Sequence, residues 1–138
     1  SDGPWVVDRL GEERTKERGY VFRSMAESGA IIMNGTDPPV EEIDPIASFH
    51  CSITRELPDG SIFQPEQRLT RDQALRSYTI NNAFAAFEEH LKGSITPNKL
   101  ADITVLSKDI MSVPEDEILA TEIIYTILGG KIVYKGTI

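Results

Sequence analysis

One carboxylate stands out in this sequence because of the residues around it. Asp37 follows an apolar run over 30–33 and precedes two prolines, Pro38 and Pro39. Proline gives no amide hydrogen to a strand ladder, so the pattern predicts a strand over 30–34 that ends just before Asp37. In a barrel of parallel strands this end is the catalytic face. Asp37 is therefore a candidate metal ligand or general base, and the alternative is an Asp that caps the following turn.

A second acid and an aromatic residue lie close to the start of the chain. Asp2 and Trp5 belong to the segment 1–11, which we expect to be a loop around Trp5. Asp2 is a candidate substrate contact, with the alternative that an acid before Gly-Pro is a turn residue. Trp5 is a candidate for the same substrate-facing surface.

The chain has two histidines and one cysteine, and their spacing limits what they can bind. His50 and Cys51 fall on a predicted helix that begins at Pro45 with Asp44 as its N-cap. Without a second ligand four residues on, His50 is favoured as a pocket-wall or packing residue over a metal ligand. A nucleophilic role is not expected for Cys51.

Metal binding by this chain alone is not expected. His50 and His90 form neither a His-x-His nor a His-x-x-x-His pair. One cysteine excludes a cysteine-based zinc site and an intrachain disulfide. A hydrolytic metal site needs about three protein ligands or more, and Asp37 alone cannot hold a metal.

Composition excludes several classes of partner. The formal net charge is −8 and the pI is near 4.7, so there is no basic stripe to neutralise nucleic-acid phosphates. No apolar run reaches membrane-spanning length and no signal peptide is visible. A single cysteine favours a reducing compartment, so we expect a cytoplasmic location, with a leader on a preceding segment left open.

The hydrophobic pattern predicts helices up to about residue 90. A helix is predicted over 12–28, with Gly29 ending it. Arg55 lies at the end of the helix that begins at Pro45, and we expect its charge to complement the dipole of that helix; the alternative is that it binds an anionic substrate. Thr70 and Gln73 form a capping box. Two helices should follow, over 71–78 and, capped by Thr79, over 80–90.

The period changes after Gly93, and strands are expected. They are predicted over 102–107, 118–128 and 131–134, with Gly129-Gly130 as a two-residue hairpin turn. Asn98 lies in a turn and is a residue that tolerates a positive φ angle.

Several motifs in order give the chain a family resemblance. The motifs are Gly35–Pro45, Thr54-Arg55, Pro65–Arg71, Ala74–Thr79, Lys92-Gly93-Ser94, Lys99–Asp102 and Gly129–Tyr134. Their order and spacing resemble the C-terminal part of amidohydrolase-superfamily enzymes, in the branch called amidohydrolase family 3. The resemblance runs over essentially the whole chain. Members usually carry Gly where this chain has Asn98.

The resemblance implies an α/β fold that is the C-terminal portion of a (β/α)8 barrel, followed by strands of a small composite β-sandwich. It implies barrel residues 1–92, sandwich residues 93–138, and Asp2 near the active-site mouth. It further implies hydrolysis of C–N bonds in small-molecule amides or cyclic amides, with Asp37 as metal ligand and general base. The expected cofactor is a divalent metal, zinc, held in a full-length protein of which this chain is a part.

The family's His-x-His pair and further histidines do not occur in this sequence. We therefore expect a fragment that is inactive alone and that forms homo-oligomers, because the strands that would cover its apolar surface are missing. A different class of function stays open: a non-catalytic interaction or assembly module that retains the terminal part of the fold.

Overall fold

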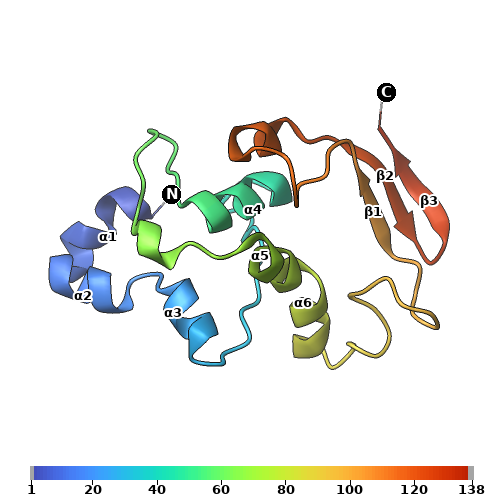
Figure 1. The fold of residues 1–138 in the computed structure, drawn as a ribbon, viewed down its shortest axis with the longest axis horizontal. Coiled ribbons are helices and arrows are strands. Elements are labelled where there is room, and N and C mark those ends of the chain that lie inside the picture. Colours follow the sequence, from blue (N-terminus) through green and yellow to red (C-terminus); the bar gives the residue numbers. More distant parts are fainter. Residues whose placement is uncertain (1, 137–138) are drawn as a thin grey trace.

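The computed structural model describes residues 2–136 and places helices at one end and a small sheet at the other (Figure 1). The helices are α1 (Gly3–Leu10), α2 (Glu12–Arg18), α3 (Phe22–Glu27), α4 (Pro45–Thr54), α5 (Arg71–Tyr78) and α6 (Ile80–Ala85), with short 3-10 helices η1 (Pro65–Gln67) and η2 (Glu115–Ala120). The strands are β1 (Ile103–Leu106), β2 (Ile123–Leu128) and β3 (Lys131–Lys135).

The loop predicted over 1–11 is wrong for the residues that the structure describes, since helix α1 occupies most of them; residue 1 lies outside the described part. Pro4 lies in the first turn of α1, where its missing amide hydrogen costs nothing. The backbone carbonyl of Asp2 accepts hydrogen bonds from the amides of Trp5 and Val6 and so begins the helix.

The helix predicted over 12–28 is two helices, α2 and α3. The break falls at Gly19, Tyr20 and Val21, and Tyr20 takes a φ of 56°, which no α-helix accommodates. Gly29 ends α3 as predicted, with a φ of 92° and its amide donated to the carbonyl of Ala26.

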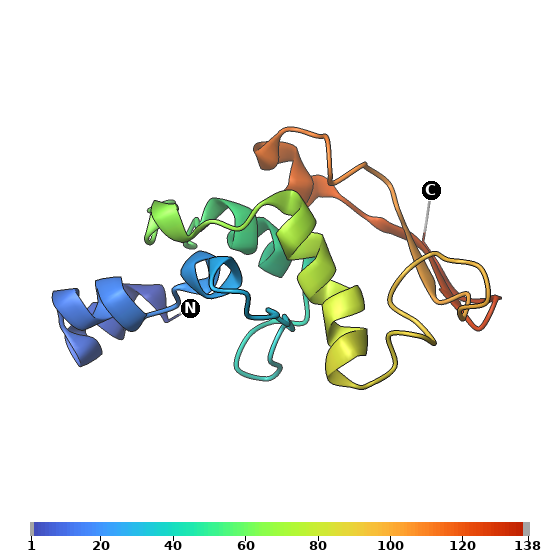
Figure 2. The same ribbon diagram turned by 60° about the horizontal axis from the view of Figure 1, so that its bottom comes forward.

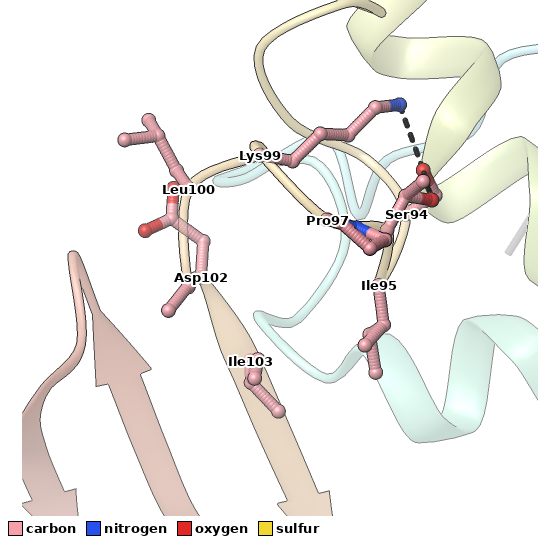
Figure 3. A pocket seen from close by; sticks show the side chains of 9 residues that line it. Ser94, Ile95, Pro97, Lys99, Leu100, Asp102 and Ile103 are labelled. Carbon is pink, nitrogen blue, oxygen red and sulfur yellow. Dashed lines mark hydrogen bonds between the residues drawn. The ribbon is translucent and has the colours of Figure 1, made fainter.

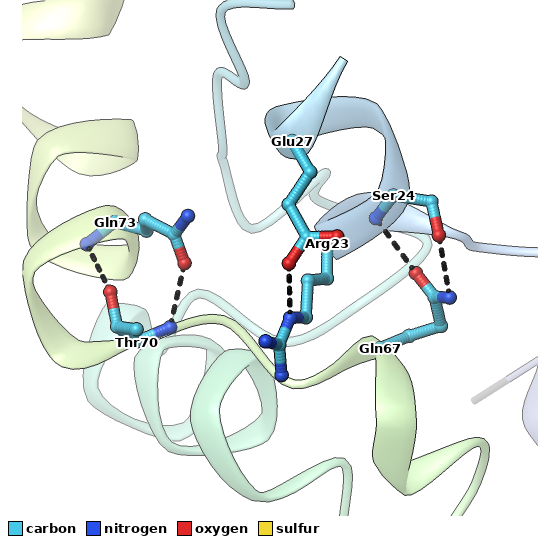
Figure 4. A network of polar contacts seen from close by, with 6 residues as sticks. All are labelled: Arg23, Ser24, Glu27, Gln67, Thr70 and Gln73. Atoms are coloured by element: carbon cyan, nitrogen blue, oxygen red, sulfur yellow. Dashed lines mark hydrogen bonds and ion pairs between the residues drawn. The ribbon is translucent and has the colours of Figure 1, made fainter. Parts of the chain in front are cut away.

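Helix α3 is tied to the following elements by side chains (Figure 4). Ser24 exchanges two hydrogen bonds with Gln67 of η1, one through its amide at 3.1 Å and one through its hydroxyl at 2.8 Å. Arg23 and Glu27 form an ion pair along the exposed side of the same helix. These contacts fix α3 against the segment that leads into α5.

The strand predicted over 30–34 is wrong, because residues 30–36 belong to no strand in the described chain. Their backbone polar groups find other partners. The amide of Asn34 donates to the carbonyl of Ser77 at 3.0 Å, and the side-chain amides of Asn81 and Asn82 donate to the carbonyls of Ile32 and Asn34. The segment is thus held by α5 and α6 instead of by neighbouring strands.

Two of the predicted helix caps are confirmed. Asp44 caps α4 by accepting the amides of Ile46 and Ala47, with Pro45 in the first turn. Thr70 and Gln73 form the reciprocal capping box of α5, which spans the predicted residues 71–78 (Figure 4).

The helix predicted over 80–90 ends early, because α6 stops at Ala85. Its expected cap, Thr79, donates its hydroxyl to the carbonyl of Leu75 and so closes α5 instead. Figure 2 shows α6 continuing almost along the line of α5, away from α1 and α2.

The core lies where α4, α5 and η2 meet. It comprises Phe49, Ile53, Leu69, Ala74, Ile110 and Ile118. Ile118, which is completely buried, comes from the C-terminal third of the chain and packs with side chains of α4. This packing connects the helical part to the segment that carries the strands.

The three strands form an antiparallel sheet in the order β1-β2-β3. Gly129 and Gly130 make the predicted hairpin turn, both with positive φ. The strand predicted over 118–128 is half right, since η2 takes its first residues and β2 begins at Ile123. The mixed helix and sheet content agrees with an α/β class, while a barrel portion stays a prediction.

Candidate active-site groove

An open groove of about 600 Å³ runs between the segment 34–42, helix α4 and the segment 55–58. Its lining combines carboxylates, one imidazole, one thiol, one guanidinium and several apolar side chains. The residues that carry these groups are Asp37, Glu41, Glu42, Asp44, Glu56, His50, Cys51, Arg55, Phe22, Ala47, Leu57, Pro58 and Leu119. The sequence-predicted residues Asp37 and His50 both line this groove.

Asp37 lines this groove, although it is not mounted on a strand. Its φ of 52° lies in the left-handed region, which Asp tolerates better than most residues. Its backbone carbonyl accepts the amides of Val40 and Glu41 and so closes the turn. The carboxylate itself is exposed and has no hydrogen bond to another described residue, so the turn leaves it available to a ligand.

His50 and Cys51 reach the groove from α4. His50 is 6% exposed, and its ring has no hydrogen bond to any residue within 2–136. Its ring nitrogens are not among the side-chain atoms that are fully buried without a partner, so they retain contact with the groove. Cys51 is a free, exposed thiol on the same wall.

Arg55 follows α4 and is fixed in an unusual way. It has a φ of 61° and is 6% exposed. Its guanidinium carbon lies 5.6 Å from the ring centre of Phe22 and 5.3 Å from that of Phe63. Its Nε donates to the carbonyl of Phe63 and its Nη2 to that of Tyr20, and burial lowers its pKa from the usual value. These two donors therefore bind loop carbonyls and not the last carbonyls of α4, while the expected interaction of the Arg55 charge with the α4 dipole stays a prediction.

Asp2 lies apart from the groove and is engaged by Tyr20. The Tyr20 hydroxyl donates to its Oδ2 at 2.5 Å, and this bond, with burial and the negative charge of Asp2, raises the pKa of Tyr20 to about 12. Trp5 is 48% exposed, with the Arg9 guanidinium carbon 5.4 Å from its ring centre. Neither Asp2 nor Trp5 lines the groove in the described chain.

The described residues do not fit a metal centre by themselves. No three His, Cys, Asp or Glu side chains among residues 2–136 are grouped so that they could hold an ion. A hydrolytic metal needs about three protein ligands. Asp37 can supply one carboxylate at most to such a centre.

A second, smaller hollow of about 330 Å³ lies beside the turn that precedes β1 (Figure 3). Its only cation among the described residues, Lys99, donates to the hydroxyl of Ser94 at 2.7 Å and reaches the carbonyl of Lys92 at 3.4 Å. Asn98 takes the predicted positive φ, here 72°. The lysine therefore closes its own turn, and Asp102 at the edge of the hollow accepts the amide of Gly129 at 2.8 Å.

Sequence reasoning missed the structural role of Arg55 and the presence of Glu42 and Glu56 in the groove. Glu42 lies within the motif over 35–45 and Glu56 lies in no motif, and the two come from separate loops that only the fold brings together. Tyr20 was missed for the same reason, since it meets Asp2 across eighteen positions. In the described chain no helix is long and apolar enough to cross a membrane.

Comparison with known proteins gives a consistent picture. The family model described as "Amidohydrolase family" matches residues 2–134. The chain is 30% identical over 138 residues to "Putative amidohydrolase YtcJ" of Bacillus subtilis (strain 168), covering 98% of this chain and 26% of that protein.

Two further relatives align over almost the whole chain. "Protein LONG AFTER FAR-RED 3" of Arabidopsis thaliana is 34% identical over 134 residues, which are 96% of this chain and 23% of the relative. "N-substituted formamide deformylase" of Arthrobacter pascens is 29% identical over 127 residues, or 92% and 23%. The chain thus spans about a quarter of the length of these relatives. No solved structure gives a significant match. With a family model that covers nearly all of it, the chain belongs to the amidohydrolase family.

Proposed function

We propose that this chain is the C-terminal part of a metal-dependent amidohydrolase that hydrolyses C–N bonds of small-molecule amides or cyclic amides. Family membership supports the reaction class. The name of the relative "N-substituted formamide deformylase" supports an amide substrate. In this proposal residues 1–92 complete a barrel and residues 93–138 contribute strands to a β-sandwich. A cytoplasmic location is part of the proposal, and the single free thiol, Cys51, supports it.

The observation that carries the proposal is the position of Asp37 in the groove. Its carboxylate is exposed, has no hydrogen bond to another described residue, and stands on a turn closed by its own backbone carbonyl. A carboxylate in this state can accept a proton from a water molecule as that water attacks the amide carbonyl carbon. The same proton then passes to the leaving nitrogen, the C–N bond breaks, and a carboxylic acid and an amine are released. Asp2, Trp5 and His50 are the proposed substrate contacts, with His50 in the groove itself.

For the metal, we propose only which residue of this chain would bind it. Asp37 would be one ligand of a divalent ion, zinc, and the remaining ligands would come from residues outside this chain. Because the described residues hold no group of three ligands, no catalytic step is assigned here to the metal, and the chain alone is proposed to be inactive.

The proposal is tested in a full-length protein that contains this chain. N-Benzylformamide serves as the probe substrate, and formate release is measured for wild type, Asp37→Asn and the control Asp116→Asn, an exposed acid in η2. Asp37→Asn should lower kcat by about 10²–10⁴-fold, the range typical of acid–base groups, while Asp116→Asn should leave it unchanged. Near-wild-type turnover by Asp37→Asn would refute the role of Asp37. No amide hydrolysis by the wild type across formamides and cyclic amides would favour the interaction module instead.

A further inference from the structure

The charge of the groove favours a cationic ligand. Carboxylates line it from two separate loops, through Asp37, Glu41 and Glu42 before α4 and through Glu56 after it. Asp44 also contributes, although its Oδ1 already accepts the amides of Ile46 and Ala47. An open surface rich in acidic groups concentrates positively charged ligands and repels negatively charged ones.

Arg55 offsets only one unit of this negative charge, because it is the one Lys or Arg among the described lining residues and the acidic side chains outnumber it. Two of its donors are committed to the backbone carbonyls of Phe63 and Tyr20, and the rings of Phe22 and Phe63 lie against its guanidinium. It is 6% exposed. A guanidinium held in this way stabilises the groove wall more than it attracts an anion.

His50 supplies an independent indication of a ligand. Its side chain is more than nine-tenths buried, lines the groove, and makes no hydrogen bond with another described residue. A neutral imidazole always has one nitrogen that can only accept a hydrogen bond. The ring nitrogens of His50 keep contact with the groove and have no partner among the described residues, so a ligand in the groove that donates an N–H to His50 would gain a hydrogen bond there.

The remaining lining residues are apolar and suit the body of an organic molecule. Phe22, Leu57 and Leu119 face the same space as the acids and His50. A small inorganic ion would leave these side chains uncovered, whereas an amine with an aromatic or aliphatic body would bury them.

We propose that the groove binds a protonated primary amine, which donates an N–H to His50 and places its charge near Glu42 and Glu56. This inference rests on the proposed function in one respect. Hydrolysis of an N-alkyl amide releases an amine that is protonated at neutral pH, and the groove would hold that leaving amine after the C–N bond has broken. The carboxylate product carries the opposite charge and would be repelled.

The test uses the 138-residue chain, so that it is independent of catalysis. The amides of ¹⁵N-labelled protein are followed by NMR during titration with benzylamine, with benzyl alcohol as the neutral control and phenylacetate as the anionic control. Benzylamine should shift signals in 34–37 and 47–57 and bind at least about fivefold more tightly than either control. Equal shifts by benzyl alcohol, or tighter binding of phenylacetate, would overturn the proposal.

Matched variants separate the local effect from net charge. Glu42→Gln with Glu56→Gln should weaken benzylamine binding by about threefold or more, as expected for two exposed ion pairs. Glu89→Gln with Glu122→Gln removes the same charge from exposed positions outside the groove and should leave binding unchanged. Equal weakening by both pairs would mean a diffuse charge effect and would refute a defined site.

Two further ligands test the hydrogen bond to His50 and the choice of an organic cation. Benzyltrimethylammonium has the charge but no N–H, so it should bind several-fold more weakly than benzylamine; equal binding would refute the assignment to His50. Mg²⁺ should neither shift the groove signals nor compete, and competition at similar concentration would indicate an inorganic cation site instead. If benzylamine fails to bind while Asp37→Asn still abolishes hydrolysis in the full-length protein, this inference fails and the proposed function stands.

Discussion

Replacing Ile118 tests how the groove is held in place. Ile118 is 0% exposed and packs in the core cluster with Phe49 and Ile53 of α4, the helix that carries His50. Ile118→Ala removes three buried carbons, worth about 2.4 kcal/mol at ~0.8 kcal/mol each, and the cavity left behind adds to this. We expect a total loss of about 3–4 kcal/mol in the free energy of unfolding, a large share of the stability of a small domain.

The assay is urea unfolding at 25 °C followed by far-UV circular dichroism, with Ile43→Ala as the matched control. Ile43 is 78% exposed, so the same chemical change should cost no more than about 0.5 kcal/mol there. A loss below about 1 kcal/mol, or equal losses for the two variants, would refute the claim that η2 anchors α4.

Three further predictions concern ionisation, metal and assembly. Asp2→Asn should lower the pKa of Tyr20 from about 12 towards its ordinary value, as measured by the absorbance of the tyrosinate at 295 nm. Because the pKa of Tyr20 is higher in the folded state, the Tyr20–Asp2 contact stabilises the fold fully below about pH 10, and this stabilisation is lost as the pH rises through about 12. An unchanged titration of Tyr20 in the variant would contradict the contact. The 138-residue chain should show no tight stoichiometric Zn²⁺ site by calorimetry, because its described residues present no group of three ligands; one tight site per chain would contradict this. Sedimentation equilibrium at tens of micromolar should show self-association through the sheet, because Ile132, Val133 and Tyr134 are exposed on β3. Ile132→Glu should weaken this self-association, and a clean monomer of the unchanged chain would count against the prediction.

The sequence by itself determined the features that depend on a few neighbouring residues. Asp44 with Pro45 begins α4, and Thr70 with Gln73 begins α5, because each cap satisfies amides no more than three positions away. The turn at Gly129-Gly130 followed in the same way from residues that adopt positive φ at little cost. The family motifs could be identified from the sequence for a related reason, since each is a short run of neighbouring residues and all of them lie within the matched residues 2–134.

Only the tertiary structure decided how segments far apart in sequence satisfy one another. Residues 30–34 have the composition of a strand, yet their backbone groups bond to Ser77, Asn81 and Asn82, and a strand needs a neighbour that the described chain does not place there. Arg55 likewise faces carbonyls and rings from two other segments instead of its own helix end. Short-range capping is decided by local geometry, whereas pairing across tens of residues depends on which partner the whole fold brings within hydrogen-bonding distance.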